Sequence, residues 1–493
     1  MDSYDVTVIG GGLLGCFAAR ALARYRLRTL LLEEREDLCT GISRANTAIV
    51  YSGCDTKPGT LKCSLCVGAA QSFGALCREL GVRYSQCGSL MIGFGPNSEE
   101  VLRKKYSQGL RNGVRGLRFL SGEEVLALEP GLNPGVRVGL FAPEAGTVIP
   151  WELGLAAAEN AVHNGVEIRR NTKVTAVEKA ENGYVLGAGG GRIFSRGIVN
   201  CAGLFADEIM EMVQKPTIRI FPNSGEYLVL DTKASGIIKH VIFHEPEKKS
   251  KGLTLVPTVE GNVLIGPTEN YSEKKDGFET SEEGFENLKS LVSEVIPALP
   301  MEHLIRSFGA IRPNPYPVFF DAGSGEYLRE ERSISEFRIN ESERNPAFLS
   351  LIGIKTPGLT CAEALGRLAA DRMAVLLGAD ENPAFDPKRP APLRLGERNF
   401  EERARLVSAN PAYGRIVCRC RCISEGEIVD SIRAVPGAVT VDGVKRRTGA
   451  GAGRCQGGFC TEGIIEILSR ELNIPPEAVC KDGPGSYILR GKE

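Results

Sequence analysis

Two short cysteine motifs near the end of the chain have the residue types and the spacing of a metal-binding site. One contains Cys418, Cys420 and Cys422 at alternate positions, and the other contains Cys455 and Cys460 on either side of Gln-Gly-Gly-Phe. Clustered thiols in short, glycine-rich loops suit an iron–sulfur cluster. Zinc is the chemical alternative, although structural zinc sites usually place two residues between paired cysteines. Because the first motif has three thiols, its ligand pair is ambiguous.

The first 35 residues carry a second chemical signal. An apolar strand runs into a turn with Gly10, Gly12 and Gly15, an apolar helix follows, and a second strand ends at Glu33. Gly10 allows a tight turn, Gly12 lets backbone N–H groups approach a pyrophosphate, and Gly15 lets helix and strand pack closely. The helix N-terminus attracts phosphates, and Glu33 can accept hydrogen bonds from a ribose diol. The pattern therefore predicts dinucleotide binding.

A second strand, small-residue turn and helix occupy residues 197–207. The turn contains Cys201, Ala202, Gly203 and Leu204. FAD is held along its whole length by its protein, so two separate turns of this kind favour FAD over a nicotinamide dinucleotide.

The composition limits the kind of protein that carries these motifs. With 493 residues the chain can form several domains, and its net charge of −1 gives no reason to expect a nucleic-acid partner. No apolar run reaches the ~20 residues of a membrane-spanning helix, although peripheral membrane contact stays open. The sequence starts without a basic, apolar leader, so we predict a cytoplasmic protein whose 15 cysteines are reduced thiols or metal ligands.

The elements that must position these residues follow from periodicity. Apolar and polar residues alternate around a Glu-Gly-Asn turn within residues 251–268, which predicts a β-hairpin. Another apolar strand ends at Arg312, and residues 358–377 have the periodicity of an apolar helix. The N-terminus of that helix would stabilise negative charge on a reduced cofactor.

Several of these motifs resemble one known superfamily. The small and polar loop over residues 43–55 and the segments 197–207, 251–268 and 349–362 are similar to those of the flavin-dependent D-amino-acid-oxidase-like superfamily. Its glycerol-3-phosphate dehydrogenase and 2-hydroxyglutarate dehydrogenase members are the most similar. The motifs in residues 413–462 resemble the bacterioferritin-associated-ferredoxin-like domain. That domain holds a 2Fe–2S cluster on four cysteines, which are Cys418, Cys420, Cys455 and Cys460 in this sequence.

The resemblance implies an α/β (α+β) fold in which a Rossmann-type FAD-binding domain is interleaved with a strand-rich substrate domain. A small helical 2Fe–2S domain follows, after a proline-rich linker that we expect to act as a semi-rigid spacer. The expected boundaries are 1–87, 150–215 and 345–377 for FAD binding, 88–149 and 216–344 for the substrate domain, 378–412 for the linker and 413–493 for the cluster.

The same motifs imply the residues that contact FAD. They are Gly10, Gly12, Leu13, Leu14, Gly15, Glu33, Glu34, Arg35, Ser43, Arg44, Ala45, Asn46, Thr47, Val174, Cys201, Ala202, Gly203, Leu204, Arg312, Lys355, Gly358, Leu359 and Thr360.

The candidate catalytic residues are mostly cationic. Superfamily members commonly aim an arginine at the position of Arg312 toward the substrate's anionic group, because a guanidinium binds carboxylate or phosphate bidentately. A structural salt bridge is the alternative for Arg312. Lys355 can anchor the anion or, if burial lowers its pKa, act as a base. Lys251 is expected to assist in anion binding.

Two further candidates could donate or accept protons. Tyr51 stands where many relatives have a histidine against the flavin, and a tyrosine at neutral pH is a donor rather than a ready base. His244 lies near the substrate segment and is a candidate base, with a structural role in its strand as the alternative.

The implied function is that of an FAD-dependent dehydrogenase for a small anionic secondary alcohol, such as glycerol 3-phosphate or a 2-hydroxy acid like 2-hydroxyglutarate. Electrons would pass through the cluster to a partner, either a second flavoprotein or another electron-accepting subunit, in an oligomer or hetero-complex. Two alternatives stay open. One is an enzyme that oxidises amines or amino acids of the opine or glycine type, and the other is a non-catalytic electron-transfer subunit.

Overall fold

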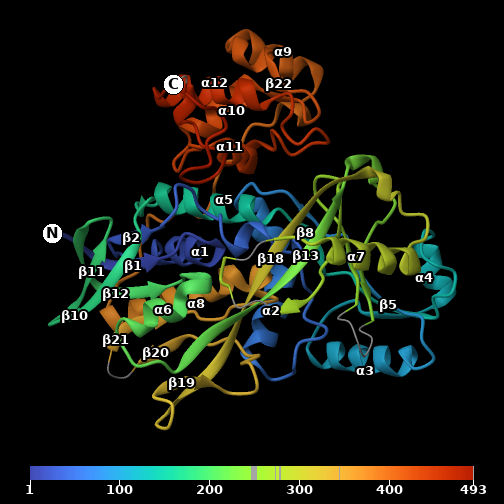
Figure 1. Ribbon diagram of the computed structural model, residues 1–493, viewed down its shortest axis with the longest axis horizontal. Coiled ribbons are helices and arrows are strands. Elements are labelled where there is room, and N and C mark those ends of the chain that lie inside the picture. Colours follow the sequence, from blue (N-terminus) through green and yellow to red (C-terminus); the bar gives the residue numbers. More distant parts are fainter. Residues whose placement is uncertain (246–251, 272–273, 277–278, 343–344, 492–493) are drawn as a thin grey trace.

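The computed structural model describes residues 1–245, 252–271, 274–276, 279–342 and 345–491, and Figure 1 shows how they are arranged. An eight-stranded sheet with its helices forms a first domain, and a ten-stranded sheet forms a second domain beside it. A small C-terminal domain, residues 400–491, lies above the helix α5 (Figure 1). None of the helices in the described part of the chain is long and apolar enough to cross a membrane.

The eight-stranded sheet is parallel at its centre. Its order is β10-β11-β12-β1-β2-β9, with β21 beside β12 and β20 beside β21. The bounds are β1 Asp2–Ile9, β2 Thr29–Leu32, β9 Glu167–Arg169, β10 Val174–Ala180, β11 Gly183–Ala188, β12 Gly191–Asn200, β20 Asn340–Ser342 and β21 Asn345–Ser350. Val6 and Val8 of β1 are completely buried, as expected for a central parallel strand with both faces covered.

Three helices cover one face of this sheet. They are α1 Leu13–Leu22, α5 Pro150–His163 and α8 Gly358–Leu377. A Cβ at Gly366 of α8 would lie 2.7 Å from the backbone of Phe17, so a glycine is needed for this close approach to α1. The other face packs against α6 Ala206–Glu211 and the start of β13 Ile218–Leu230.

The ten-stranded sheet is mostly antiparallel, in the order β19-β18-β13-β16-β15-β14-β5-β7-β6, with β17 beside β13. The bounds of the remaining strands are β5 Ser89–Gly93, β6 Arg118–Ser121, β7 Val138–Ala142, β14 Val241–His244, β15 Thr254–Pro257, β16 Val263–Gly266, β17 Asn270–Tyr271, β18 Leu304–Asp321 and β19 Glu326–Arg329. Since β15 and β16 pair antiparallel around Thr258–Asn262, the predicted hairpin is confirmed.

Each face of the ten-stranded sheet has its own core. One face packs against α4 Gly122–Leu128 and α7 Glu282–Val295, and the other carries a smaller apolar cluster around Tyr227. The remaining elements are α2 Leu61–Glu79, α3 Ser98–Arg111, which packs against β5, β6 and β7, and a three-stranded sheet of β3 Ile49–Val50, β8 Gly146–Val148 and β4 Tyr84–Ser85. The predicted interleaving of two sheet domains in one chain is therefore confirmed.

The C-terminal domain is built from short helices around an apolar core with Ile428, Val444, Ile464 and Leu468. Its elements are α9 Phe400–Ala409, β22 Ile416–Cys418, β23 Ile423–Ser424, α10 Glu425–Arg433, α11 Val441–Thr448 and α12 Thr461–Leu472. β22 and β23 form a two-stranded sheet, so the predicted small helical domain also contains a short sheet.

The proline-rich segment 378–412 differs from the predicted spacer. The side-chain amide of Asn160 donates to the carbonyls of Asp386 and Lys388, both at 3.0 Å, and Arg20 donates to the carbonyl of Pro387 at 3.0 Å. Arg389 forms an ion pair with Glu159 of α5. This part of the segment is held against the first domain because α1 and α5 satisfy its backbone carbonyls. Its last third contains α9.

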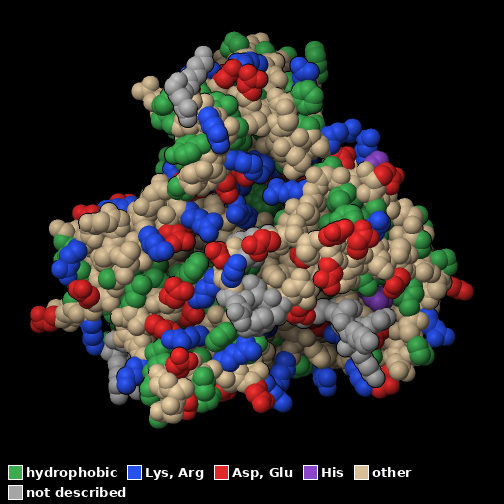
Figure 2. Space-filling model, viewed as in Figure 1, with side chains coloured by type: hydrophobic (Ala, Val, Ile, Leu, Met, Phe, Trp, Pro, Cys, Tyr) green, Lys and Arg blue, Asp and Glu red, His purple; other side chains and the backbone are tan. Residues whose placement is uncertain are grey.

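A buried carboxylate joins the C-terminal domain to the first domain. Asp37 is 0% exposed, and both arginines of the α11 pair Arg446 and Arg447 donate to it at 2.7–3.1 Å. Arg44 and Arg446 also pair with Asp482. Burial alone would raise the pKa of Asp37, but the two guanidinium groups hold it well below its ordinary value. In Figure 2, Lys and Arg side chains gather where the C-terminal domain meets the rest of the molecule.

We predict that Asp37→Asn lowers the free energy of unfolding by about 3–5 kcal/mol, because two buried guanidinium groups lose their counter-ion. Asp37 contributes this stability above the pKa of an unfolded aspartate, about 3.9, and loses it as the pH falls toward its low folded pKa. Denaturant unfolding from pH 7 down to about pH 3 measures both effects, and the variant should show a flatter acid dependence.

The matched control is Glu178→Gln, which removes an exposed ion pair with Arg192 and should change stability by at most about 1 kcal/mol. Equal denaturant midpoints for Asp37→Asn and the wild type would mean that the contacts of Asp37 with Arg446 and Arg447 contribute no net stability.

Candidate functional site

The glycine turn after β1 has the shape that a pyrophosphate requires. A Cβ at Gly10 would lie 2.6 Å from the carbonyl of Cys201, and one at Gly15 would lie 1.9 Å from the carbonyl of Gly10. Gly10 is therefore fixed by close packing of the two predicted phosphate-side turns, and Gly15 by close packing within the first turn. A Cβ at Gly12 would meet only the hydroxyl of Ser43, at 3.4 Å, and would otherwise enter open space. That open space beside the N-terminus of α1 is where a phosphate group fits.

Glu33 supports the same turn from the end of β2. Its carboxylate is 8% exposed and accepts hydrogen bonds from the backbone N–H groups of Gly11, at 2.7 Å, and Arg35, at 2.9 Å. Burial raises the pKa of Glu33. Each carboxylate oxygen keeps a lone pair after accepting one N–H, so Glu33 can still accept a ribose hydroxyl. Glu34 lies beside this turn, where its described partners are Lys173 and Arg35.

The loop after Glu33 contains residues that support the glycine turn and one residue that contacts the C-terminal domain. Ser43 accepts a hydrogen bond from the N–H of Leu13, and Asn46 braces the loop by donating to the carbonyls of Ile42 and Ser43. Arg44 instead forms an ion pair with Asp482 of the C-terminal domain. The described contacts thus give Arg44 a role at the domain junction, and its contact with FAD stays a prediction.

The other predicted cofactor residues lie at the edges of the same sheet. Val174 is buried at the start of β10, and the N–H of Cys201 donates to the carbonyl of Ile9 at 2.8 Å. The helix α8 begins at Gly358, and the hydroxyl of its buried Thr360 accepts a hydrogen bond from the N–H of Tyr51 at 2.9 Å. This bond joins the N-terminus of α8 to the loop that carries Tyr51.

The register of β13 and β18 brings Arg312 and two tyrosines to one sheet face. Arg312 lies opposite Asn223, and Phe308 lies opposite Tyr227, so the side chains of Arg312 and Tyr227 are on the same face. Tyr51 packs against the apolar cluster around Tyr227. Burial raises the pKa of Tyr51 and of Tyr227, and the nearby guanidinium of Arg312 only partly opposes this. Both phenols are therefore neutral donors at pH 7.

The two predicted cations share this strand face. The side chain of Arg312 is 26% exposed, and its guanidinium lies 3.6 Å from the carboxylate of Glu269. Lys355 donates to Asn314 at 3.1 Å and to Ser333 at 3.4 Å. Asn314 is two residues beyond Arg312 in β18, so the two side chains point to the same face of the strand, and Asn314 links Lys355 to that face.

His244 lies on the opposite face of the sheet from Arg312 and Tyr227. The ring of Phe243 stacks on Tyr51 with centroids 5.8 Å apart, and successive side chains of β14 point to opposite faces. His244 accordingly packs against Phe94 on the face covered by α4 and α7. We correct the prediction of His244 as a base for this reason. Lys251 lies outside the described residues.

The cysteines of the two motifs come together in the C-terminal domain. The sulfur of Cys420 lies 3.9 Å from that of Cys418 and 3.8 Å from that of Cys455. The sulfur of Cys460 forms a hydrogen bond with the thiol of Cys418. Four adjacent soft thiols are the donor set of an iron–sulfur cluster. Cys422 has a left-handed backbone, and its thiol points toward the carbonyl of Arg419 at 3.6 Å. These positions favour the predicted set of four over one that contains Cys422.

Sequence reasoning missed Tyr227, Glu269, Asn314 and the junction residues around Asp37. Tyr227 and Asn314 become candidates only once the register with Arg312 is known. The adjacent Arg446 and Arg447 were a visible signal, but their acidic partner is distant in sequence.

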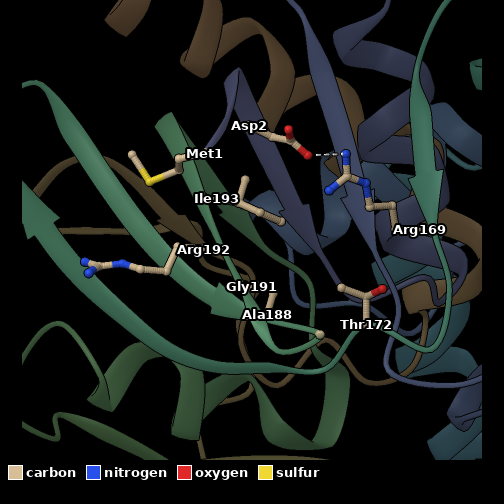
Figure 3. Close-up of a pocket in the computed structure, with 9 residues that line it drawn as sticks. Met1, Asp2, Arg169, Thr172, Ala188, Gly191, Arg192 and Ile193 are labelled. Atoms are coloured by element: carbon tan, nitrogen blue, oxygen red, sulfur yellow. Dashed lines mark hydrogen bonds and ion pairs between the residues drawn. The ribbon is translucent and has the colours of Figure 1, made fainter.

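A surface hollow of about 560 Å³ lies elsewhere, at the outer end of the eight-stranded sheet (Figure 3). Asp2, Arg169, Thr172 and Ile193 are among its lining residues, and Arg169 is already paired with Asp2. The hollow shares no lining residue with the sites described above, so we assign it no role in the reaction.

The comparison with known proteins agrees with this geometry. Residues 5–372 match the family described as DAO, FAD dependent oxidoreductase, and residues 416–470 match the BFD-like 2Fe–2S binding domain. The chain is 39% identical to the glycerol 3-phosphate dehydrogenase of Caloramator mitchellensis, over 99% of this chain and 98% of that protein. It is 27% identical to the mitochondrial L-2-hydroxyglutarate dehydrogenase of Bos taurus, over 70% of this chain and 77% of that protein.

A solved structure has the same fold over the first two domains. The dithionite-reduced L-α-glycerophosphate oxidase from Mycoplasma pneumoniae with FAD bound aligns with a TM-score of 0.71 and 24% identity, over 80% of this chain and 100% of that one. The open space at Gly12 fits FAD, and the gathered thiols fit the cluster. The chain therefore belongs to the DAO family of FAD-dependent oxidoreductases, is similar to glycerol-3-phosphate dehydrogenase, and has FAD and a 2Fe–2S cluster as its cofactors.

Proposed function

We propose that this protein is a dehydrogenase that oxidises glycerol 3-phosphate, or a closely similar anionic secondary alcohol such as a 2-hydroxy acid. The observation that carries the proposal is the Arg312 guanidinium on one strand face with the neutral phenols of Tyr51 and Tyr227, where Asn314 of the same strand accepts a hydrogen bond from Lys355. The full-length similarity to a glycerol 3-phosphate dehydrogenase supports the phosphate ester as the first substrate to test.

The residues divide the work of binding and proton transfer. Arg312 would bind the anionic group bidentately, in exchange for its weak contact with Glu269. The phenol of Tyr51 can donate a hydrogen bond to the substrate but cannot accept its proton, since burial keeps the phenol neutral. Bound FAD would supply a two-electron acceptor for the hydride, and the cluster would supply one-electron transfer to an external acceptor protein.

Because the phenol of Tyr51 stays protonated, another side chain must accept the hydroxyl proton of the substrate. With His244 on the other sheet face, Lys355, which donates to Asn314 two positions beyond Arg312, is the candidate that we test. A lysine accepts a proton only in its neutral form, which requires desolvation or a neighbouring positive charge.

The substrate assignment predicts a selective bleaching of the flavin. In anaerobic mixing, glycerol 3-phosphate should reduce the flavin faster than 2-hydroxyglutarate, glycine or proline. Arg312→Ala should weaken the binding of glycerol 3-phosphate about tenfold to a hundredfold, because it removes a charge-assisted hydrogen-bond pair, and should leave the FAD content unchanged.

Arg103→Ala, which removes an exposed arginine of α3, is the control and should behave as the wild type. If an amino acid reduced the flavin faster than glycerol 3-phosphate, the enzyme would be an amine-oxidising one instead. Failure of every substrate would support the non-catalytic alternative.

For Lys355 we predict the role of a base. Lys355→Met should retain FAD and substrate binding while the flavin reduction rate at saturating substrate falls by about 10²–10⁴-fold. The change of that rate with pH that titration of Lys355 would produce should also disappear. Rapid mixing across a pH series measures both quantities. A rise in the substrate dissociation constant alone, with the maximal rate unchanged, would make Lys355 an anchor instead.

The cluster assignment predicts different outcomes for two neighbouring cysteines. Cys455→Ser should lose iron and sulfide, keep FAD, and keep flavin reduction by substrate while transfer to an external acceptor fails. Cys422→Ser is the matched control and should keep the cluster, since the Cys422 thiol contacts the carbonyl of Arg419 and is not one of the four predicted ligands. Iron and sulfide analysis of anaerobically prepared protein checks this. Zinc without sulfide in the wild type would remove the electron-transfer role.

A further inference from the structure

Both cysteine loops contact the second domain through an arginine beside a predicted cluster ligand. Arg421 follows Cys420 and forms an ion pair with Glu260. Arg454 precedes Cys455 and lies 3.7 Å from Asp231. Each loop of the cluster site is thus held by one acid of the ten-stranded domain.

Of the two acids, Glu260 belongs to the larger network of ion pairs. It sits in the turn between β15 and β16 and pairs with Arg83, at 2.5 Å, as well as with Arg421. Arg83 also pairs with Glu152 of α5, which in turn pairs with Arg394. The five side chains alternate in charge, and none of them is more than 29% exposed. These side chains form one continuous ion-pair network from the cysteine loop to α5, and their partial burial weakens the screening by salt.

The same hairpin also contributes to the sheet face that carries Tyr227. Val256 of β15 and Leu264 of β16 belong to the apolar cluster that contains Tyr227 and against which Tyr51 packs. Asp231 directly follows β13, the strand that carries Tyr227. The elements that contact the two cysteine loops are therefore continuous with the strands that carry Tyr227 and the apolar cluster around it.

We propose that Glu260 and Asp231 are positioning residues for electron transfer between the two cofactors, holding the cysteine loops at a fixed place on the second domain. The inference rests on the proposed function. Two electrons leave the substrate as a hydride, and the cluster accepts one at a time. The proposal therefore includes an external one-electron acceptor that reoxidises the cluster between transfers, while the released protons go to solvent.

Glu260→Gln is the sharper test, because Asp231 also caps the turn at Thr232–Ala234. The variant should keep FAD, iron, sulfide and the rate of flavin bleaching by glycerol 3-phosphate. The subsequent reduction of the cluster, followed by electron paramagnetic resonance in rapidly frozen samples, should slow about tenfold or more, since one partner of a desolvated charge pair is removed. Hydrogen exchange in residues 416–423 and 449–457 should become faster.

Glu99→Gln, an exposed glutamate paired within α3, is the matched control and should change none of these quantities. Unchanged cluster reduction and unchanged hydrogen exchange in Glu260→Gln would overturn the positioning role. If glycerol 3-phosphate does not bleach the wild-type flavin, the proposed function fails separately. The positioning role is then tested by reducing the flavin with light and a sacrificial donor, with the same two outcomes.

Discussion

The arrangement of the molecule depends on one buried charge, the carboxylate of Asp37. An ionised group without contact to water is tolerated only when it is paired and hydrogen-bonded, and the two arginines that hydrogen-bond to Asp37 come from α11 of another domain. The partner Arg446 is 409 positions away in the sequence. The loop between Glu33 and Ser43, which lies along the predicted phosphate site, is therefore shaped by the C-terminal domain. Cofactor binding and domain docking share one structural element.

A second set of constraints acts through the face of the ten-stranded sheet. The register of β13 with β18 gathers Arg312, Asn314 and Tyr227, and the bond between Tyr51 and Thr360 attaches this face to the start of α8. Positive charge, neutral phenols and a helix N-terminus then meet at one place. Each comes from a different segment, and none could serve the proposed chemistry alone.

The sequence was informative where the signal is local. The glycine turn, the hairpin over residues 251–268, the α8 periodicity and the thiol motifs each lie within a short window, and the structure contains them. Long-range pairing was not accessible in this way. Alternation shows that Phe243 and His244 point to opposite faces, but only the packed sheet shows that Phe243 is the one that faces Tyr51. The partner of Arg44 and the packing of the proline-rich segment likewise depend on distant residues.

The order of strands in the first sheet also bears on how the chain is made. β1 lies between β2 and β12, and β12 pairs in turn with β21, which ends at Ser350. The helix α1 gains its neighbour α8 only after Leu377 has been synthesised. Because chains emerge from the ribosome N-terminus first, the residues of the glycine turn wait for most of the polypeptide before their surroundings exist. Such distant pairings close late and slowly, so the nascent chain exposes apolar strands for an extended time and is a natural client for chaperones.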